Sequence, residues 1–195
     1  MAKYRELENV LKRYIDSPAG GRGEGRGILR ELLKTESVDT RHGLLMNVRG
    51  TAYITLTALH EAAGANDLES IRLMLDGFPS DKKYDLLKIQ SDGYTPLQTA
   101  ATCGHSSIIT YLMTDLSQQQ KHDVLKIQDM CGDTALHDAA SQNKIETYRA
   151  ILASVPYHLL LELGKIKNNA GKTVTDIKPE IKDEYIVPIA EGKQI

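Results

Sequence analysis

Apolar residues recur along the chain at the spacing of a helix face, in short stretches that predict short helices. In the middle of the chain, one stripe of apolar residues has the spacing of a helix face and ends at Gly104. The first stripe consists of Leu97, Ala100 and Ala101. A second stripe follows the glycine and consists of Ile108, Ile109, Leu112 and Met113. Because glycine interrupts helices, the pattern predicts two short helices joined by a tight turn.

The same arrangement recurs along the chain. Similar segments start at Ile54 (ITLTALHEAA), Asp92 (DGYTPLQTAA), Cys131 (CGDTALHDAA) and Ala170 (AGKTVTDI). Their shared threonines, Thr57, Thr95, Thr134 and Thr173, are 38, 39 and 39 residues apart. Two further series recur at nearly the same interval, namely Ile89, Ile127 and Ile166, and Ser80, Ser117 and Ser154. The sequence therefore predicts a tandem array, in which Gly93, Gly132 and Gly171 form turns and the following threonines cap helices.

TALHEAA, TPLQTAA and TALHDAA resemble the T-P-L-H-x-A signature of ankyrin repeats, and GHSSIITYL resembles the second helix of such a repeat. The resemblance covers roughly residues 50–178. It implies an all-α ankyrin-repeat solenoid of helix-turn-helix units with turn or hairpin fingers. The repeats of 38–39 residues are unusually long, since about 33 is usual. The additional residues follow the second helix, where Ser80, Ser117 and Ser154 are predicted to cap an extra helical turn.

The repeats predict a division of the chain into five parts. Residues 1–50 form a divergent first repeat or an N-terminal cap, and residues 168–195 form a degenerate C-terminal capping repeat and tail. Between them lie three ankyrin repeats, at residues 51–90, 91–128 and 129–167.

Composition narrows the class of function. The 24 basic and 26 acidic side chains give a net charge of -2, which argues against a nucleic-acid binder. No apolar run approaches the length of a membrane span, and the first residues lack the apolar core of a secretory signal. The two cysteines are too few for a disulfide framework. A cytoplasmic protein that binds neither nucleic acid nor membrane is expected.

Candidate catalytic groups have structural explanations. His60 and His137 occupy TALH positions, where by resemblance a histidine bonds to backbone groups between neighbouring units. Cys103 and His105 fit the turn between two helices, with Cys103 expected in or near the core, whereas Cys131 is expected at an exposed turn. The segment GGRGEGRG at residues 20–27 lacks the Lys-Ser or Lys-Thr ending of a phosphate loop. The sequence therefore predicts no catalytic residue, no metal site, no cofactor and no enzymatic activity.

By resemblance, an ankyrin array binds partners through its finger tips and first helices. The predicted partner-binding residues are Tyr53, Ile54, Glu61, Asp92, Tyr94, Gln98, Thr99, Asp129, Met130, Asp133, Asp138 and Ser141. Tyrosine and methionine are enriched at interfaces, and the acidic neighbours indicate a partner with some positive charge. An alternative is that Tyr94 and Ile54 pack against the neighbouring tip. The expected function is that of a monomeric, non-enzymatic module that binds another protein.

Two other functions stay open at this point. The chain could be a bacterial effector-type adaptor that acts inside a host cell, in the host cytoplasm. It could also be an enzyme with its site in the N-terminal 50 residues, although no site is visible there.

Overall fold

The computed structural model describes residue 9, residues 37–46 and residues 58–180. Regular structure in these residues is helical, apart from one isolated antiparallel bridge between Ser91 and Tyr94. The first helices of three successive units are α4 (Ala58–Gly64), α7 (Pro96–Cys103) and α10 (Ala135–Ser141). The second helices are α5 (Leu68–Leu75), α8 (Ser106–Met113) and α11 (Ile145–Ala153). Third helices follow as α6 (Ser80–Leu87), α9 (Gln118–Leu125) and α12 (Tyr157–Leu163), while α3 (Val38–Met46) precedes and α13 (Val174–Ile177) ends the array.

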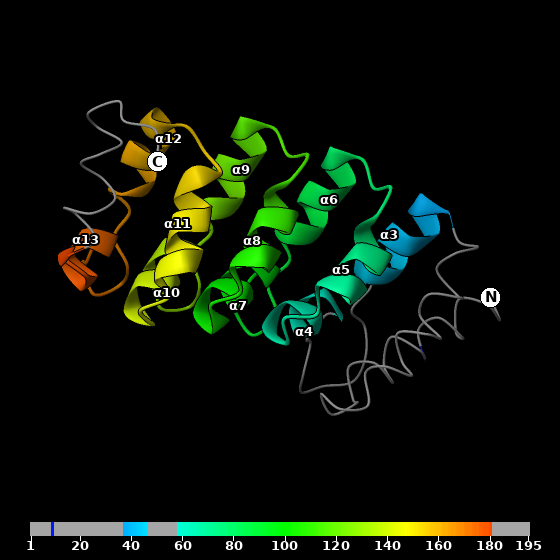
Figure 1. Ribbon diagram of the computed structural model, residues 1–195, viewed down its shortest axis with the longest axis horizontal. Coiled ribbons are helices and arrows are strands. Elements are labelled where there is room, and N and C mark those ends of the chain that lie inside the picture. Colours follow the sequence, from blue (N-terminus) through cyan, green and yellow to red (C-terminus); the bar gives the residue numbers. More distant parts are fainter. Residues whose placement is uncertain (1–8, 10–36, 47–57, 181–195) are drawn as a thin grey trace.

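Equivalent helices of successive units stack in rows (Figure 1). In that view α4, α7 and α10 follow the lower edge, and α6, α9 and α12 follow the upper edge. Each row is held by contacts between neighbours: α4 with α7 and α7 with α10, α8 with α11, and α6 with α9 and α9 with α12. At the two ends, α3 contacts α6, and α13 contacts α10. The array therefore extends one unit at a time, as expected for a solenoid.

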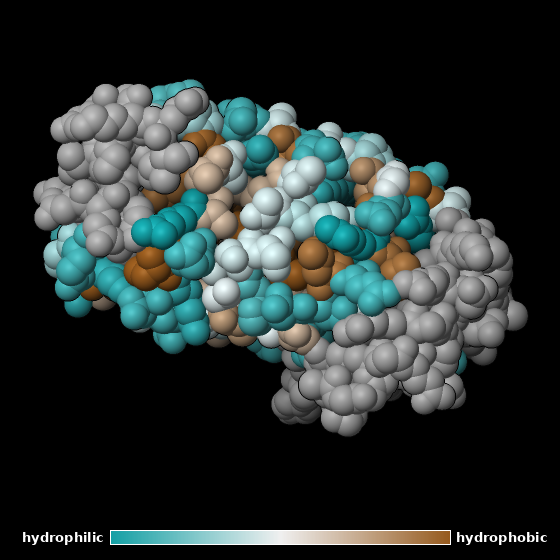
Figure 2. Space-filling view, in the orientation of Figure 1, coloured by the Kyte–Doolittle hydropathy of each residue, from teal (hydrophilic) through white to brown (hydrophobic). Residues whose placement is uncertain are grey.

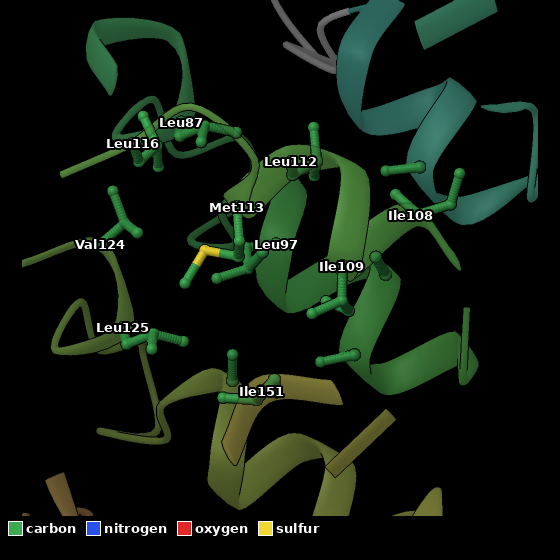
Figure 3. Close-up of a cluster of buried hydrophobic side chains, with 14 of the residues drawn as sticks. Leu87, Leu97, Ile108, Ile109, Leu112, Met113, Leu116, Val124, Leu125 and Ile151 are labelled. Atoms are coloured by element: carbon green, nitrogen blue, oxygen red, sulfur yellow. The ribbon is translucent and has the colours of Figure 1, made fainter. Parts of the chain in front are cut away.

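The core is aliphatic and runs through the whole stack (Figure 3). In the central unit, Leu97 of α7 lies beside Met113 of α8, and Leu125 of α9 belongs to the same cluster. Alanine pairs on the first helices are buried, and they are Ala62 and Ala63, Ala100 and Ala101, and Ala139 and Ala140. Because alanine has the smallest apolar side chain, these pairs let the first helices of adjacent units approach closely.

The predicted glycine turns are confirmed, and so are the caps at Thr95 and Thr173. Thr57 lies outside the described residues, and the Thr134 hydroxyl is hydrogen-bonded to the His137 Nδ1 instead, at 2.8 Å. Gly93, Gly132 and Gly171 have φ values of 85°, 76° and 74°, in the left-handed region that glycine adopts without strain. The Thr95 hydroxyl accepts a hydrogen bond from the Gln98 amide, and Thr173 does the same at the start of α13. These local signals fix where each first helix begins.

The predicted extra helical turn is a separate helix in each unit, but only one of the three serines caps it. Ser117 precedes α9 and accepts a hydrogen bond from the Gln120 amide. Ser80 is instead the first residue of α6, and Ser154 ends α11. Pro79 and Pro156 stand at the starts of α6 and α12, with φ of -65° and -70°. Since the proline ring fixes φ, the backbone direction at these two starts needs no serine cap.

Two basic side chains close the ends of second helices in the following unit. The Lys83 ammonium of α6 donates to the carbonyl oxygens of Tyr111 and Thr114, at 2.9 and 2.7 Å, where α8 ends. Arg41 of α3 donates to the Asp76 carbonyl oxygen at 2.9 Å, where α5 ends. Cations at helix C-termini satisfy orphan carbonyls and favour the helix dipole. Residues of α3 therefore contact the next unit as residues of α6 do.

Candidate functional site

The structure describes three finger turns, at residues 91–94, 129–133 and 168–172. Each is anchored by one side chain from the first helix of the preceding unit. In each case a side-chain nitrogen donates to the backbone carbonyl that precedes the next helix-capping threonine. The bonds run from His60 to Tyr94 at 2.9 Å, from Gln98 to Asp133 at 2.8 Å and from His137 to Lys172 at 3.2 Å. Burial lowers the pKa of His60 to about 4, and burial also lowers the pKa of His137. The two rings are therefore neutral donors at pH 7, and the predicted structural role of both histidines is confirmed.

The prediction that Gln98 is an exposed position of the first helix is wrong. Its side chain is 1% exposed. Its Oε1 accepts from the backbone amide of Thr95 at 2.9 Å, while its Nε2 donates to the next finger. A primary amide carries both an acceptor and a donor. The Gln98 amide therefore makes the hydrogen bonds that the two ring nitrogens of His137 make at the equivalent position of the next unit.

A second set of anchoring side chains was missed by the sequence analysis. Gln90 donates to the carbonyl oxygens of Gly93 at 3.0 Å and Gln128 at 2.9 Å. Gln128 in turn donates to the carbonyl oxygens of Gly132 and Lys167, the latter at 2.9 Å. The signal was present as the last residue of LLKIQ and VLKIQ. Each finger is thus hydrogen-bonded both within itself and to its neighbour.

The predicted partner-binding residues differ in exposure. Those that are exposed are Asp92, Met130 and Ser141, and those that are half-buried are Glu61, Tyr94, Thr99, Asp129 and Asp133. Gln98 and Asp138 are buried. Tyr53 and Ile54 lie outside the described residues.

The finger tip at residues 129–133 places a large apolar side chain in solvent. Asp129 shapes this tip, because its Oδ1 accepts from the backbone amides of Cys131 and Asp133, both at 2.8 Å. Met130, between them, is 73% exposed. Its side chain also lies against Gly93 of the preceding finger, where an added Cβ would come within 2.6 Å of the Met130 Cγ. Met130 therefore extends across the boundary between two fingers and stays open to solvent.

Asp138 of α10 is not the exposed residue that the sequence predicts, because it is 7% exposed. The helix is covered from both sides, by α7 and by α13. Its Oδ2 has no hydrogen-bond partner among the described residues. Burial, and then the negative charges of Asp129 and Asp133, raise the pKa of Asp138 to about 7, while Thr102 acts in the opposite direction. Burial and the charges of Asp129 and Asp138 also raise the pKa of Tyr94.

Cys103 and Cys131 are both free and exposed. The expected position of Cys103 in or near the core is therefore wrong, because the thiol at the end of α7 faces solvent. His105 does not serve it as a base, since its Nε2 donates to the carbonyl oxygen of Gly64 in the preceding unit, at 3.0 Å. Among the described residues, no group of three or more His, Cys, Asp or Glu side chains is arranged to hold a metal ion. No helix in the same part of the chain is long and apolar enough to span a membrane.

Stacked helix pairs with hydrogen-bonded finger turns define a helical repeat protein. A family model for ankyrin repeats in three copies matches residues 24–124, and the chain belongs to this family. The all-α ankyrin-repeat fold expected from the sequence is confirmed. The chain is also similar to the E3 ubiquitin-protein ligase KEG of Arabidopsis thaliana, with 28% identity over 167 residues. The matched region is 84% of this chain and 9% of KEG, so the chain spans about a tenth of that relative. Ankyrin repeats are generally protein-protein interaction modules.

Proposed function

We propose that this chain is a non-enzymatic module that binds a partner protein at its finger tips. The tip surface is defined here by Asp92, Tyr94, Asp129, Met130 and Asp133. The observation that carries the proposal is Met130, which is 73% exposed beside the half-buried Tyr94. Met and Tyr side chains are enriched in interface cores. The exposed Met130 side chain leaves most of its apolar surface free for a partner.

The fingers are suited to binding because their backbones are already ordered. Each is held by a hydrogen bond from a side chain of the preceding unit. Immobilising loops and side chains on association costs free energy. A surface ordered before binding avoids part of that cost, which supports the tip surface over an unanchored loop.

Large exposed apolar side chains outside the tip surface are few among the described residues. Figure 2 shows one face of the molecule, on which hydrophobic residues form small separate patches among hydrophilic ones. Large exposed hydrophobic side chains among the described residues are Met130 and Leu161, the latter 42% exposed on α12. Leu161 lies on α12, outside the tip surface, and provides a matched control for Met130.

The test is a double variant, Tyr94→Ala with Met130→Ala. Proteins that the immobilised wild-type chain retains from an extract of its native cells should be retained at least about tenfold less by the double variant. The Leu161→Ala chain should retain them as the wild type does. Thermal melting should place all three chains within a few degrees of each other, because none of these side chains fills the core. Equal retention by wild type and double variant would remove the tip surface from consideration.

We also propose that residues 1–50 contain a divergent first repeat. The family match begins at residue 24, and α3 contacts α6 much as α6 contacts α9. Arg41 and Lys83 then occupy equivalent places, each closing a second helix of the unit that follows. The two exposed free thiols support the proposal of a reducing, cytoplasmic location.

A further inference from the structure

The least compensated charge in the described part of the molecule is the Asp138 carboxylate. It is more than nine-tenths buried, and its Oδ2 has no hydrogen-bond partner there. Burying a carboxylate in this way is costly unless a cation or hydrogen-bond donors compensate for lost water.

The groups that face Asp138 do not provide this compensation. From the second finger, Asp129 and Asp133 add negative charge, and from α7 the polar neighbour is the Thr102 hydroxyl. That hydroxyl also donates to the Gln98 carbonyl oxygen, at 3.0 Å. Among the described residues, no ion pair joins Asp138 to a basic side chain. The site is therefore a cluster of three carboxylates that lacks a counter-ion from the described residues.

We propose that the partner protein supplies this counter-ion, as a lysine or arginine side chain that docks on the tip surface over Asp129, Asp133 and Asp138. This inference rests on the proposed function and names the chemistry of the partner. The cation reaches the cluster through Asp129 and Asp133, which are half-buried, because the Asp138 Oδ2 is itself shielded from solvent. Asp138 acts beneath them by adding a third negative charge.

The neighbouring side chains suit the stem of such a residue. The alkyl part of a lysine or arginine packs on apolar surface while its head stays polar. Exposed Met130 and half-buried Tyr94 lie on the same finger tips as the carboxylates, and the charge of Asp138 acts on the Tyr94 hydroxyl. One basic side chain can therefore use the apolar and the acidic parts of the tip surface together.

The experiment uses the full chain and a phage-displayed library of random peptides. The library is first passed over the Tyr94→Ala, Met130→Ala double variant to remove phage that bind elsewhere. The remaining phage are then selected on the wild-type chain, so that the phage retained there bind the tip surface. We expect these peptides to share a lysine or arginine position. In the peptide that binds most tightly, replacing this lysine or arginine by methionine should weaken binding to the wild-type chain about tenfold, as for other close charge pairs at interfaces.

A double-mutant cycle then tests the role of Asp138. Against the Asp138→Asn chain, replacing the basic residue by methionine should cost clearly less, about threefold, because one of the three negative charges is gone while Asp129 and Asp133 remain. Asp115→Asn is the matched control, because Asp115 is an exposed carboxylate outside the tip surface, with a φ of 67° that asparagine also tolerates, and its replacement should leave the tenfold effect intact. Folding of each chain is checked by circular dichroism.

The outcomes separate the two proposals. No peptide dependent on Tyr94 and Met130 would contradict the proposed function itself. Tip-surface peptides without a shared basic position would overturn only the counter-ion proposal. The same result follows if the lysine-to-methionine loss is equal in wild-type and Asp138→Asn chains. A loss that shrinks with Asp115→Asn as much as with Asp138→Asn would also overturn it, because the effect would then be one of overall charge.

Discussion

Replacing Asp138 with asparagine is expected to stabilise the folded chain increasingly as the pH rises from about 5 to about 8. The pKa of Asp138 is raised from 3.8 to about 7 in the folded chain. The folded chain therefore binds this proton more tightly than the unfolded chain does, and stability is lost as the pH rises through the interval between the two values. Asparagine keeps the shape of the side chain and has no proton to lose in this range.

The magnitude follows from the shift. At about 1.4 kcal/mol per pKa unit, a rise from 3.8 to about 7 corresponds to about 4 kcal/mol when Asp138 is fully ionised in both states. Part of this is already lost at pH 5, where the unfolded carboxyl is ionised. Between about pH 5 and pH 8 the free energy of unfolding of the variant should gain about 2 to 3 kcal/mol over that of the wild type.

The assay is urea unfolding, followed by circular dichroism at several pH values. Taking the difference between variant and wild type cancels the titration of the other carboxylates and histidines. Asp92→Asn serves as the control, because Asp92 is exposed at a finger tip with a φ of 50° that asparagine also tolerates. A difference between Asp138→Asn and wild type that does not change with pH, or that changes equally for Asp92→Asn, would refute the reasoning.

Three further variants test the anchoring of the fingers by urea unfolding. Gly132→Ala should cost at least about 1 kcal/mol more than Gly171→Ala, because both glycines have positive φ but only at Gly132 would a Cβ meet the Asn169 backbone nitrogen, at 2.6 Å. Lys83→Met should cost about 2 kcal/mol, since two carbonyl oxygens at the end of α8 lose a buried charged donor. Gln98→Ala should cost about 2 kcal/mol, whereas Gln98→His should stay within about 1 kcal/mol of the wild type.

Each of these has a result that would contradict it. Equal losses for the two glycine variants would mean that the finger at residue 132 moves away freely. A Lys83→Met loss no larger than that of the exposed Lys88→Met would show that the two carbonyl oxygens find water instead. A Gln98→His chain as unstable as Gln98→Ala would show that histidine and glutamine are not equivalent in this unit.

The fold could be predicted from the sequence because its signals are local. A glycine with positive φ, a capping threonine and an apolar stripe lie within about ten residues of each other, so their meaning depends little on distant parts of the chain. The serines near the third helices were less informative. Their role depends on whether a proline precedes the helix, as Pro79 and Pro156 do, and Ser117 has none.

The candidate site could be predicted only in part, because burial depends on neighbouring units. Thr99 and Asp138 occupy the same register in TPLQTAA and TALHDAA. The first is half-buried and the second is buried, although both helices lie between two neighbours, α7 between α4 and α10, and α10 between α7 and α13. The difference therefore depends on the particular residues of the neighbouring units and not on the motif. Gln98 was misplaced for a related reason. The motif marked it as a missing histidine, while its hydrogen bonds show that an amide performs the same anchoring.

The sign of each variant's effect on stability distinguishes the two roles of these fingers. Gln98 and Lys83 satisfy carbonyl oxygens of the next unit, so their removal should destabilise the fold and affect binding only through it. The Asp138 Oδ2 has no hydrogen-bond partner within the described residues and adds negative charge to that of Asp129 and Asp133. Its neutralisation should therefore stabilise the fold and weaken the binding of a basic partner. A side chain that costs stability and contributes to binding is typical of functional sites. Measuring both quantities for Asp138→Asn therefore separates a structural residue from a binding residue, which neither measurement does alone.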